Sequence, residues 1–472
     1  MNIFETDRFL KIIPLVFLLF LIGCNPEPTN DDHKLVKDYS NKVIWEWNEL
    51  LMQIEKDAMF YRPGPAPRAV SYMAYSAYEI CLPGMVHYRS LRFELQHPAP
   101  GNQLPVLNDR RGIHYPLAIN ASCGLLMHKF FENAKFLAPQ TTQNVLKLIK
   151  DQEQKLEKEY TVEILQNASL NVNNSKAWGQ EMALAVWAWS QEDALARDAY
   201  VSEDKARPHA DGILGEGFWQ TYNPGVKGMF SYWGDVYSFA VPNTSKLINP
   251  TYKFPINYAD TSSEIYDEMR EVYDQCEEVR KSPTGNLAHI AQFWSDDVVG
   301  NSFSPPIRFV AIADQVFQKS KCDLEKTVVC MAKLGLALND AGVCAWKNKY
   351  AYNIERPISM IRRYIDPNWN LPWLESTPAF PAWPSGHSTF GWAGATILAH
   401  EFGNNINMYD SCHINNPHII NSPRFFENFT DMAHENAESR IPLGVHFRMD
   451  AEGGERLGKR VGNIVLAMKW KK

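Results

Sequence analysis

The chain has 472 residues, of which 45% are apolar, and 47 Lys and Arg against 54 Asp and Glu give it a formal net charge of −7. This composition excludes a disordered or collagen-like chain, and mild acidity without a basic run argues against a nucleic-acid-binding protein. One long apolar block, at the N-terminus, is too little for a polytopic membrane protein.

The N-terminus has the pattern of an export signal. The apolar run Ile12–Ile22 follows two basic residues and is too short to span a bilayer, as is typical of a signal peptide. The run ends in L-I-G-C, which resembles a bacterial lipobox and predicts cleavage before Cys24 and lipidation of its thiol. Residues 1–23 would then be the signal and residues 24–33 a polar tether, anchoring an exported protein to a bacterial membrane. An ordinary signal peptide with an incidental Cys24 is the alternative.

The cysteines do not define a disulfide framework. If Cys24 is lipidated, seven cysteines remain, and an odd number cannot all pair within the chain. A bond such as Cys322–Cys330 stays open for an oxidising compartment.

The rest of the chain has a helical pattern. Apolar residues recur at spacings of three and four, and sustained two-residue alternation is scarce. The predicted helical segments are Val36–Phe60, Arg68–Cys81, Gly124–Phe136, Thr141–Leu165, Ala177–Leu195, Ser262–Val279, Gly285–Trp294, Arg308–Leu338, Asp340–Tyr364, His387–Phe402, Arg424–Arg440 and Gly444–Met468. Pro208–Pro255 is expected to be irregular and Pro367–Pro384 to be a loop. This predicts an all-α protein of packed helical bundles, with an N-terminal helical half at residues 34–300 and a catalytic half at residues 301–472.

The first C-terminal motif is K-Y-A-Y-N-I-E-R-P, from Lys349 to Pro357. Seven residues are nearly two helical turns, so Lys349 and Arg356 are expected on one helix face, with Trp346 on the same stripe. Two cations on one face suit a multiply charged anion. Alone, the motif also fits two basic residues on a solvated surface.

The second motif is P-S-G-H, Pro384 to His387, at the start of a predicted helix. Ser385 is a good N-cap, and the first amides of a helix attract anions. Gly386 allows a ligand to approach the backbone, and His387 can exchange a proton near neutral pH. A plain capped helix with an incidental histidine is the alternative.

The third motif runs from Ser439 through Arg440 and His446 to Asp450. Because His446 and Asp450 are four residues apart, we expect them on one helical face, where the carboxylate can orient the imidazole. The alternative is a surface pair of little consequence. Together the three motifs gather cations, a hydroxyl, amides and two imidazoles, which would be costly to bury without an anion.

The three motifs in this order resemble the superfamily that joins vanadium-dependent haloperoxidases with type-2 phosphatidic acid phosphatases and bacterial acid phosphatases. The resemblance covers about Trp346–Gly458. It implies an α-helical bundle with a pocket between its core helices.

The resemblance also implies a role for each motif residue. Lys349, Arg356 and Arg440 would neutralise the equatorial oxygens of vanadate or phosphate, and Ser385 and the Gly386 amide would hydrogen-bond them. His446 would coordinate vanadium or attack phosphorus, His387 would be the acid or base opposite, and Asp450 would orient His446.

Residues around the motifs resemble the peroxidase branch. Trp346 and Phe380 occupy positions where aromatics flank the halide path, and the long N-terminal half is absent from small acid phosphatases. Asp296, in F-W-S-D, would support the pocket arginine or the acid–base histidine; an exposed aspartate before a turn is the alternative.

The resulting expectation is a vanadate-dependent haloperoxidase that oxidises halide with hydrogen peroxide to hypohalous acid, with a small organic acceptor as a further partner. His387 would take the peroxide proton, and Lys349 would polarise the peroxide. A phosphatase with His446 as nucleophile is the second hypothesis, and a non-catalytic, phosphate-binding lipoprotein is the third.

Overall fold

The computed structural model describes residues 34–472 except for 97, 108–111, 198, 200–214, 222–227, 243, 245–247, 252–257, 374–376, 418, 420 and 421. The predicted signal, Cys24 and the tether lie outside the described residues, as does much of Pro208–Pro255. The residues from Lys34 onward form one compact unit. The boundary expected near residue 300 stays a prediction.

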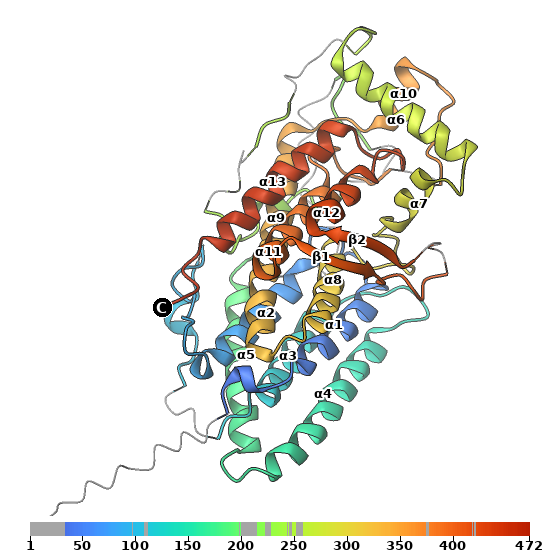
Figure 1. Cartoon of the computed structure of the whole chain (residues 1–472). Helices are drawn as coiled ribbons and strands as arrows, with labels where there is room; N and C mark the ends of the chain where they lie inside the picture. The colour runs from blue at the N-terminus through green and yellow to red at the C-terminus, as the bar shows by residue number, and fades with distance from the viewer. Residues whose placement is uncertain are drawn as a thin grey trace, which may run out of the picture. The chain divides into compact units, whose positions relative to one another are not determined.

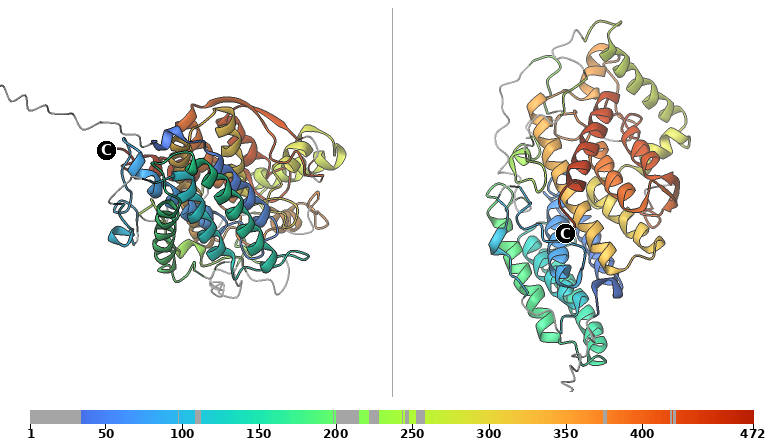
Figure 2. Two further views of the ribbon diagram at one scale, coloured as in Figure 1. Left: turned by 90° about the horizontal axis from the view of Figure 1, so that it is seen from below. Right: turned by 60° about the vertical axis from the view of Figure 1, so that its left-hand side comes forward.

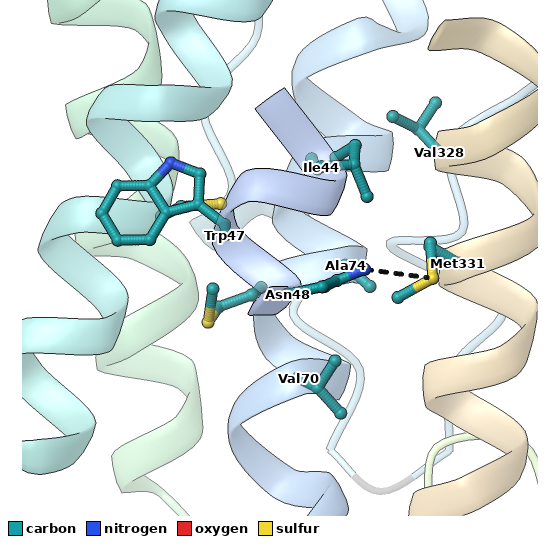
Figure 3. Close-up of a pocket in the computed structure, with 10 residues that line it drawn as sticks. Ile44, Trp47, Asn48, Val70, Ala74, Val328 and Met331 are labelled. Carbon is teal, nitrogen blue, oxygen red and sulfur yellow. Dashed lines mark hydrogen bonds between the residues drawn. The ribbon is translucent and has the colours of Figure 1, made fainter. Parts of the chain in front are cut away.

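The first part of the chain is a group of packed helices (Figure 1, blue to green). They are α1 (Lys42–Glu55), α2 (Pro67–Cys81), α3 (Tyr115–Phe131), α4 (Thr142–Leu165) and α5 (Val172–Gln191). Side-chain caps fix the starts of the last two, where Thr141 and Asn171 each accept from the amide three residues ahead. The packing between α1, α2 and α9 leaves a void of only about 20 Å³, beside Ile44, Val70 and Met331 (Figure 3).

The second part adds eight helices within the described residues, together with one β-hairpin. The helices are α6 (Glu264–Lys281), α7 (Asn286–Phe293), α8 (Pro305–Lys319), α9 (Leu324–Tyr352), α10 (Pro357–Tyr364), α11 (Gly386–Phe402), α12 (Phe429–Glu438) and α13 (Arg448–Leu466). The hairpin pairs β1 (Asn405–Asp410) with β2 (Arg424–Asn428) in antiparallel register. Short 3-10 turns occur at Val36–Asp38, Leu82–Gly84, Gly101–Gln103 and Trp233–Asp235. The all-α expectation is therefore confirmed, with one small hairpin added.

Helix α9 is the central element, because it packs against α2 of the first part and against α11 and α13 of the second. Among the described helices it is the one long and apolar enough to cross a membrane, yet that apolar window is entirely buried inside the protein. Its length and apolarity therefore match those of a core helix.

Helices α11 and α13 lie side by side because α13 carries glycines at the contact (Figures 1 and 2). A Cβ atom on Gly458 would lie 2.4 Å from the Thr389 carbonyl oxygen, and one on Gly454 would lie 2.7 Å from that of Ser385. Close backbone packing thus brings the start of α11 against the start of α13.

Several predicted helix boundaries are wrong. Gly124–Phe136 is the second half of a helix that begins at Tyr115, and Val36–Phe60 is a 3-10 turn followed by α1.

Two further boundaries lie on either side of α9. The chain does not break between Leu338 and Asp340, but turns after Lys319, where Asp323 caps the new helix α9 by accepting from the Lys326 amide. Nor does one helix run through Asp340–Tyr364, because Asn353 adopts a left-handed conformation (φ 52°) and ends α9.

The segment Arg424–Arg440 is also not a single helix. Its first residues form strand β2, and α12 begins at Phe429 after Asn428 caps it. The partner strand β1 has alternating exposed and buried residues, a period of two over six residues. So short a run carries little weight beside long helical patterns.

Candidate active site

The three motifs meet in the interior. The end of α9 and the following turn supply Lys349 and Arg356, the start of α11 supplies Ser385 to His387, and the turn before α13 supplies Arg440 and His446. Lys349, Arg356 and Arg440, called here the cationic cage, are all buried.

Lys349 is held by backbone oxygens. Its Nζ donates to the carbonyl oxygens of Pro381 and Ala382, both at 2.9 Å. The nitrogen also lies 5.0 Å from the centre of the Phe380 ring and 6.0 Å from that of Trp346. The two aromatic residues predicted to flank the halide path therefore both border this lysine.

Arg356 reaches the site differently from the prediction. It is the N-cap residue of α10, so it shares no helix face with Lys349. The left-handed turn at Asn353 redirects the chain, and Pro357 opens the next helix at its first position. The Arg356 Nε donates to the Phe380 carbonyl at 2.9 Å, and the Arg356 Nη1 donates to the Val445 carbonyl at 2.7 Å.

His446 and Asp450 form the predicted pair without sharing a helical face. His446 precedes α13, and Asp450 lies in its first turn. The His446 Nδ1 lies 3.0 Å from Asp450 Oδ2, which also accepts from the Phe447 amide at 2.9 Å. The Ser385 amide donates to the Asp450 carbonyl at 2.9 Å, which ties the second motif to the third.

Arg440 and His387 leave nitrogen atoms available. Arg440 Nη1 donates to the Trp294 carbonyl at 2.7 Å, and Asn436 donates to the His387 carbonyl at 3.0 Å. Arg440 Nε, Arg356 Nη2 and His387 Nε2 are buried and lack a partner among the described residues. Buried nitrogens normally find a partner, and these three belong to side chains close enough for their charges to act on one another, which fits a bound ligand.

The electrostatics point to an anion. Burial lowers the pKa of Arg440 to about 10, and burial together with the Arg440 charge lowers the pKa of Arg356 to about 9. Burial, and then the neighbouring cations, lower the pKa of His387 and of His446. A bound oxyanion would oppose these shifts, since negative charge favours the protonated forms.

The space in the site also suits an oxyanion. A Cβ atom on Gly386 would meet only the Trp346 ring, at 3.9 Å, so the backbone there is open to a ligand. Nowhere in the described ranges do three or more His, Cys, Asp or Glu gather as they would for a metal cation. The donors present, cations and N–H groups, match the oxygens of vanadate or phosphate.

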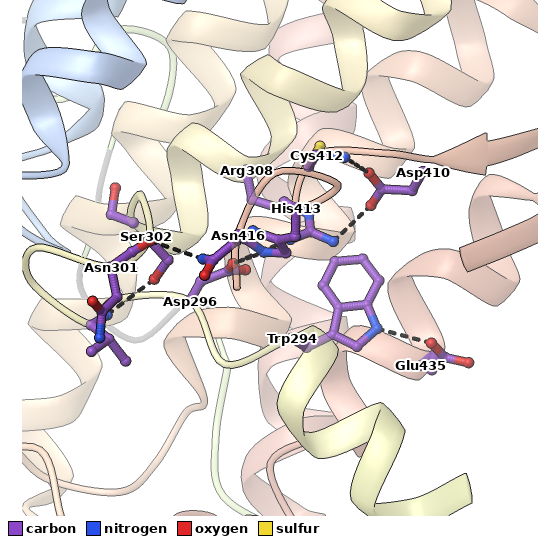
Figure 4. A network of polar contacts seen from close by, with 12 residues as sticks. Trp294, Asp296, Asn301, Ser302, Arg308, Asp410, Cys412, His413, Asn416 and Glu435 are labelled. Atoms are coloured by element: carbon purple, nitrogen blue, oxygen red, sulfur yellow. Dashed lines mark hydrogen bonds and ion pairs between the residues drawn. The ribbon is translucent and has the colours of Figure 1, made fainter. Parts of the chain in front are cut away.

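A buried polar network surrounds Arg308 (Figure 4). Arg308 pairs with Asp410 at 2.7 Å and with Asp296 at 3.3 Å, and its guanidinium lies 4.6 Å from the centre of the Trp294 ring. His413 Nε2 is 3.0 Å from Asp296. Asp296 thus bonds to Arg308 and His413, and within the described residues it makes no hydrogen bond to Arg440 or His387. Its charge acts on Arg440 nonetheless, since it opposes the effect of burial on the pKa of that arginine.

Sequence reasoning missed the other members of this network. Trp294 contributes a backbone carbonyl, for which residue type gives no signal. Arg308, Asp410 and His413 come from separate elements and belong to no motif. Only the combination of full burial with charge identifies them, and burial follows from the fold.

Part of this chain is similar in sequence to known proteins. Residues 329–471 match a family model described as the VCPO second helical-bundle domain. The vanadium chloroperoxidase of Curvularia inaequalis is 28% identical over 166 residues, which span 25% of this chain and only 27% of that protein.

Solved structures share the fold over most of the chain. A bacterial vanadium-dependent iodoperoxidase aligns with a TM-score of 0.73 and 24% identity, over 91% of this chain and 96% of that one. The holo form of a bacterial vanadium-dependent chloroperoxidase aligns with a TM-score of 0.59 and 14% identity, over 91% and 97%. In sequence and in fold, this chain resembles the vanadium-dependent haloperoxidases, and its residues 329–471 match the second helical-bundle domain of that family.

Proposed function

We propose that this protein is a vanadium-dependent haloperoxidase that oxidises halide with hydrogen peroxide to hypohalous acid. The observation that carries the proposal is the set of buried, unpartnered nitrogens on Arg356, Arg440 and His387. They gather beside His446, an imidazole oriented by a carboxylate. The similarity to vanadium haloperoxidases supports vanadate as the cofactor.

His446 would hold the vanadium through Nε2. Its Nδ1 faces Asp450, and a carboxylate there accepts a hydrogen bond from Nδ1–H, which leaves the lone pair on Nε2. Arg356 Nη1, a donor, lies 3.2 Å from Nε2, as expected if that nitrogen is the acceptor. Both contacts favour the His446 tautomer with its proton on Nδ1.

The other residues would bind oxygens and move a proton. The cationic cage would neutralise the oxygens of the oxyanion, and the Ser385 hydroxyl and the Gly386 amide would hydrogen-bond them. When bound, vanadate supplies Lewis-acid activation of hydrogen peroxide, and the vanadium keeps one oxidation state. His387 would accept the peroxide proton, since its Nε2 is buried without a hydrogen-bond partner among the described residues.

Phosphate ester hydrolysis is the second candidate. The same cage suits the trigonal-bipyramidal geometry of phosphoryl transfer, and an oriented His446 could act as a nucleophile. The rings of Trp346 and Phe380, with centroids 5.2 Å apart, favour the peroxidase. Their apolar surface suits a soft, weakly hydrated halide better than a strongly hydrated phosphate ester.

A direct comparison of the two reactions tests the proposal. The chain from Asn25 onward, loaded with vanadate, should oxidise iodide most readily among iodide, bromide and chloride, and should not hydrolyse an aryl phosphate. Hydrolysis without halide oxidation, with a phosphohistidine trapped by acid, would establish the phosphatase. Phosphate binding with neither activity would favour a non-catalytic protein.

We also propose that the protein is exported and anchored through Cys24. The support is the lipobox-like sequence, which lies outside the described residues. Replacing Cys24 with alanine should move the protein from the membrane fraction to the soluble fraction of the cell.

A further inference from the structure

A cavity of about 370 Å³ lies near the cage, and among the described residues that line it none has a charged side chain. Its size falls within the usual range for small-molecule sites. Its wall includes Gln292 at the end of α7, Asn301 in the following loop, Trp373 and Asn416. Figure 4 shows Asn301 and Asn416 next to the buried Arg308 network.

The cavity shares two chain segments with the site. Ser295, which lines it, directly follows Trp294, whose carbonyl accepts from Arg440 Nη1 at 2.7 Å. Leu443, which also lines it, lies midway between Arg440 and His446 in the turn before α13. The loop and the turn that position the cage therefore also form walls of the cavity.

The side chains that line the cavity indicate the chemical class of its ligand. The Gln292 Oε1 is buried and lacks a partner among the residues the structure describes, so it calls for an O–H or N–H donor. Trp373 is 39% exposed and offers a ring face, while Val298, Ile419 and Leu443 add apolar surface. The described part of the wall offers no cation, so it suits an uncharged molecule better than the halide or the oxyanion that the cage attracts.

We propose that this cavity binds an uncharged organic acceptor of the phenol class, which is halogenated beside the cage. The proposal rests on the function proposed above. In the cage, halide, hydrogen peroxide and a proton give hypohalous acid and water. In the cavity, a ring carbon forms a bond to the halogen and loses its proton, and the hydroxide released from hypohalous acid takes that proton to give a second water.

Binding is measured first, on the chain without vanadate, by calorimetric titration with phenol. Wild type should bind phenol more tightly than anisole, which lacks the donor, and should not bind benzoate, which is charged. Val298→Trp should weaken phenol binding at least tenfold by filling the cavity. The matched control is Val162→Trp on α4, where the side chain is 59% exposed and lines no part of the cavity.

Gln292→Leu decides the case if Val298→Trp does not fold. It removes the acceptor at similar volume, so the preference for phenol over anisole should disappear. Absence of phenol binding to wild type, or equal binding by Val298→Trp and Val162→Trp, would overturn the proposal. A Gln292→Leu variant that keeps the preference would do the same.

Triiodide formation in the absence of phenol separates this proposal from the proposed function. Vanadate-dependent triiodide formation without phenol binding refutes the cavity alone. Phenol binding without triiodide formation refutes the peroxidase and leaves a binding site. In the active enzyme, iodophenol formation should saturate with phenol; a product ratio identical to that of free hypoiodous acid would show that the acceptor reacts in solution.

Discussion

The two imidazoles of the site differ in what holds them. His446 is fixed at Nδ1 by Asp450. The His387 backbone carbonyl accepts a hydrogen bond from Asn436, but the His387 Nε2 has no partner among the described residues. An oriented imidazole suits a ligand, which must keep one direction, and an imidazole with an available nitrogen suits proton transfer. The two histidines should therefore fail in different ways when they are removed.

We expect His446→Ala to lose bound vanadate, because no other imidazole is oriented by a carboxylate in the cage. His387→Ala should bind vanadate within a few-fold of wild type and lose roughly 10²–10⁴-fold in turnover, the usual contribution of a general acid or base. Equilibrium dialysis with vanadate, alongside halide oxidation, measures both. Stoichiometric vanadate in His446→Ala, or full activity in His387→Ala, would contradict these roles.

At this scale the three motifs predicted from the sequence do contact one another, but the helical spacing assigned to them is wrong, and the roles of their residues stay predictions. The three motifs are short, so each fixes which side chains lie close together. The helical spacing assigned to Lys349 and Arg356 was wrong, because a left-handed Asn353 ends the helix between them. A single asparagine in an apolar, helical context gives no clear sign of that turn.

Among elements, the loop after α7 depends on a buried cation from α8. The Arg308 guanidinium lies 4.6 Å from the ring centres of both Phe293 and Trp294, and it pairs with two carboxylates. Because the Trp294 carbonyl accepts from Arg440, the position of this loop sets the position of one cage residue. We infer that Arg308 is a positioning residue for Arg440.

Replacing Arg308 with methionine should weaken vanadate binding at least tenfold. It should also cost about 3–5 kcal/mol of stability, because two carboxylates lose a buried partner. The matched control is Lys333→Met, which removes another buried cation, paired with Glu401, about 24 Å along α9 from Lys349. Vanadate dissociation constants and melting temperatures of both variants test this. Equal vanadate affinity in the two would show that Arg308 is only structural.

Helix α8 also buries an acid that lacks a counterion. Asp314 accepts one hydrogen bond from Asn48 at 2.8 Å, and its other oxygen has no partner in the described part of the chain. Burial raises the pKa of Asp314 well above its usual value. Above a pH of about 4 the unfolded chain ionises this group while the folded protein keeps it protonated, so stability falls as the pH rises.

Asp314→Asn should remove this pH dependence. The amide oxygen can still accept from Asn48, and the amide does not ionise, so the variant should gain about 1–3 kcal/mol over wild type at pH 8 and less at pH 4. Urea unfolding at both pH values measures the difference. The control, Asp151→Asn at a half-exposed position on α4, should show no such trend. A gain that is constant with pH would rule out this explanation.

The helices and strands also show which features of the fold the sequence patterns predict and which they do not. Long amphipathic helices such as α4 and α6 were predicted close to their observed bounds, because many residues contribute to one period. The hairpin of β1 and β2 was missed, because its six- and five-residue strands are too short to outweigh the helical residues beside them. Which helices pack together depends on contacts far apart in the sequence, and the motifs do not encode those contacts.

For the whole molecule, the buried cations of the cage repel one another and so destabilise the folded state. Three buried cations meet with Asp450 as the carboxylate bound to the site histidine, and close packing of α11 on α13 holds them together. The cost of such uncompensated charge falls on the folded state alone, since the unfolded chain hydrates each group. An anion that fits the cage should therefore stabilise the entire protein.

Vanadate, and more weakly phosphate, should raise the melting temperature. At a concentration one hundred times the dissociation constant, a ligand that binds only the folded state adds about 2.7 kcal/mol, which corresponds to a rise of a few degrees. Chloride at the same ionic strength should have no comparable effect, because a monovalent spherical ion cannot engage several donors at once. In Arg440→Ala the rise should shrink, since one cage cation is missing. An equal rise with chloride, or an undiminished rise in Arg440→Ala, would mean that the stabilisation arises outside the cage.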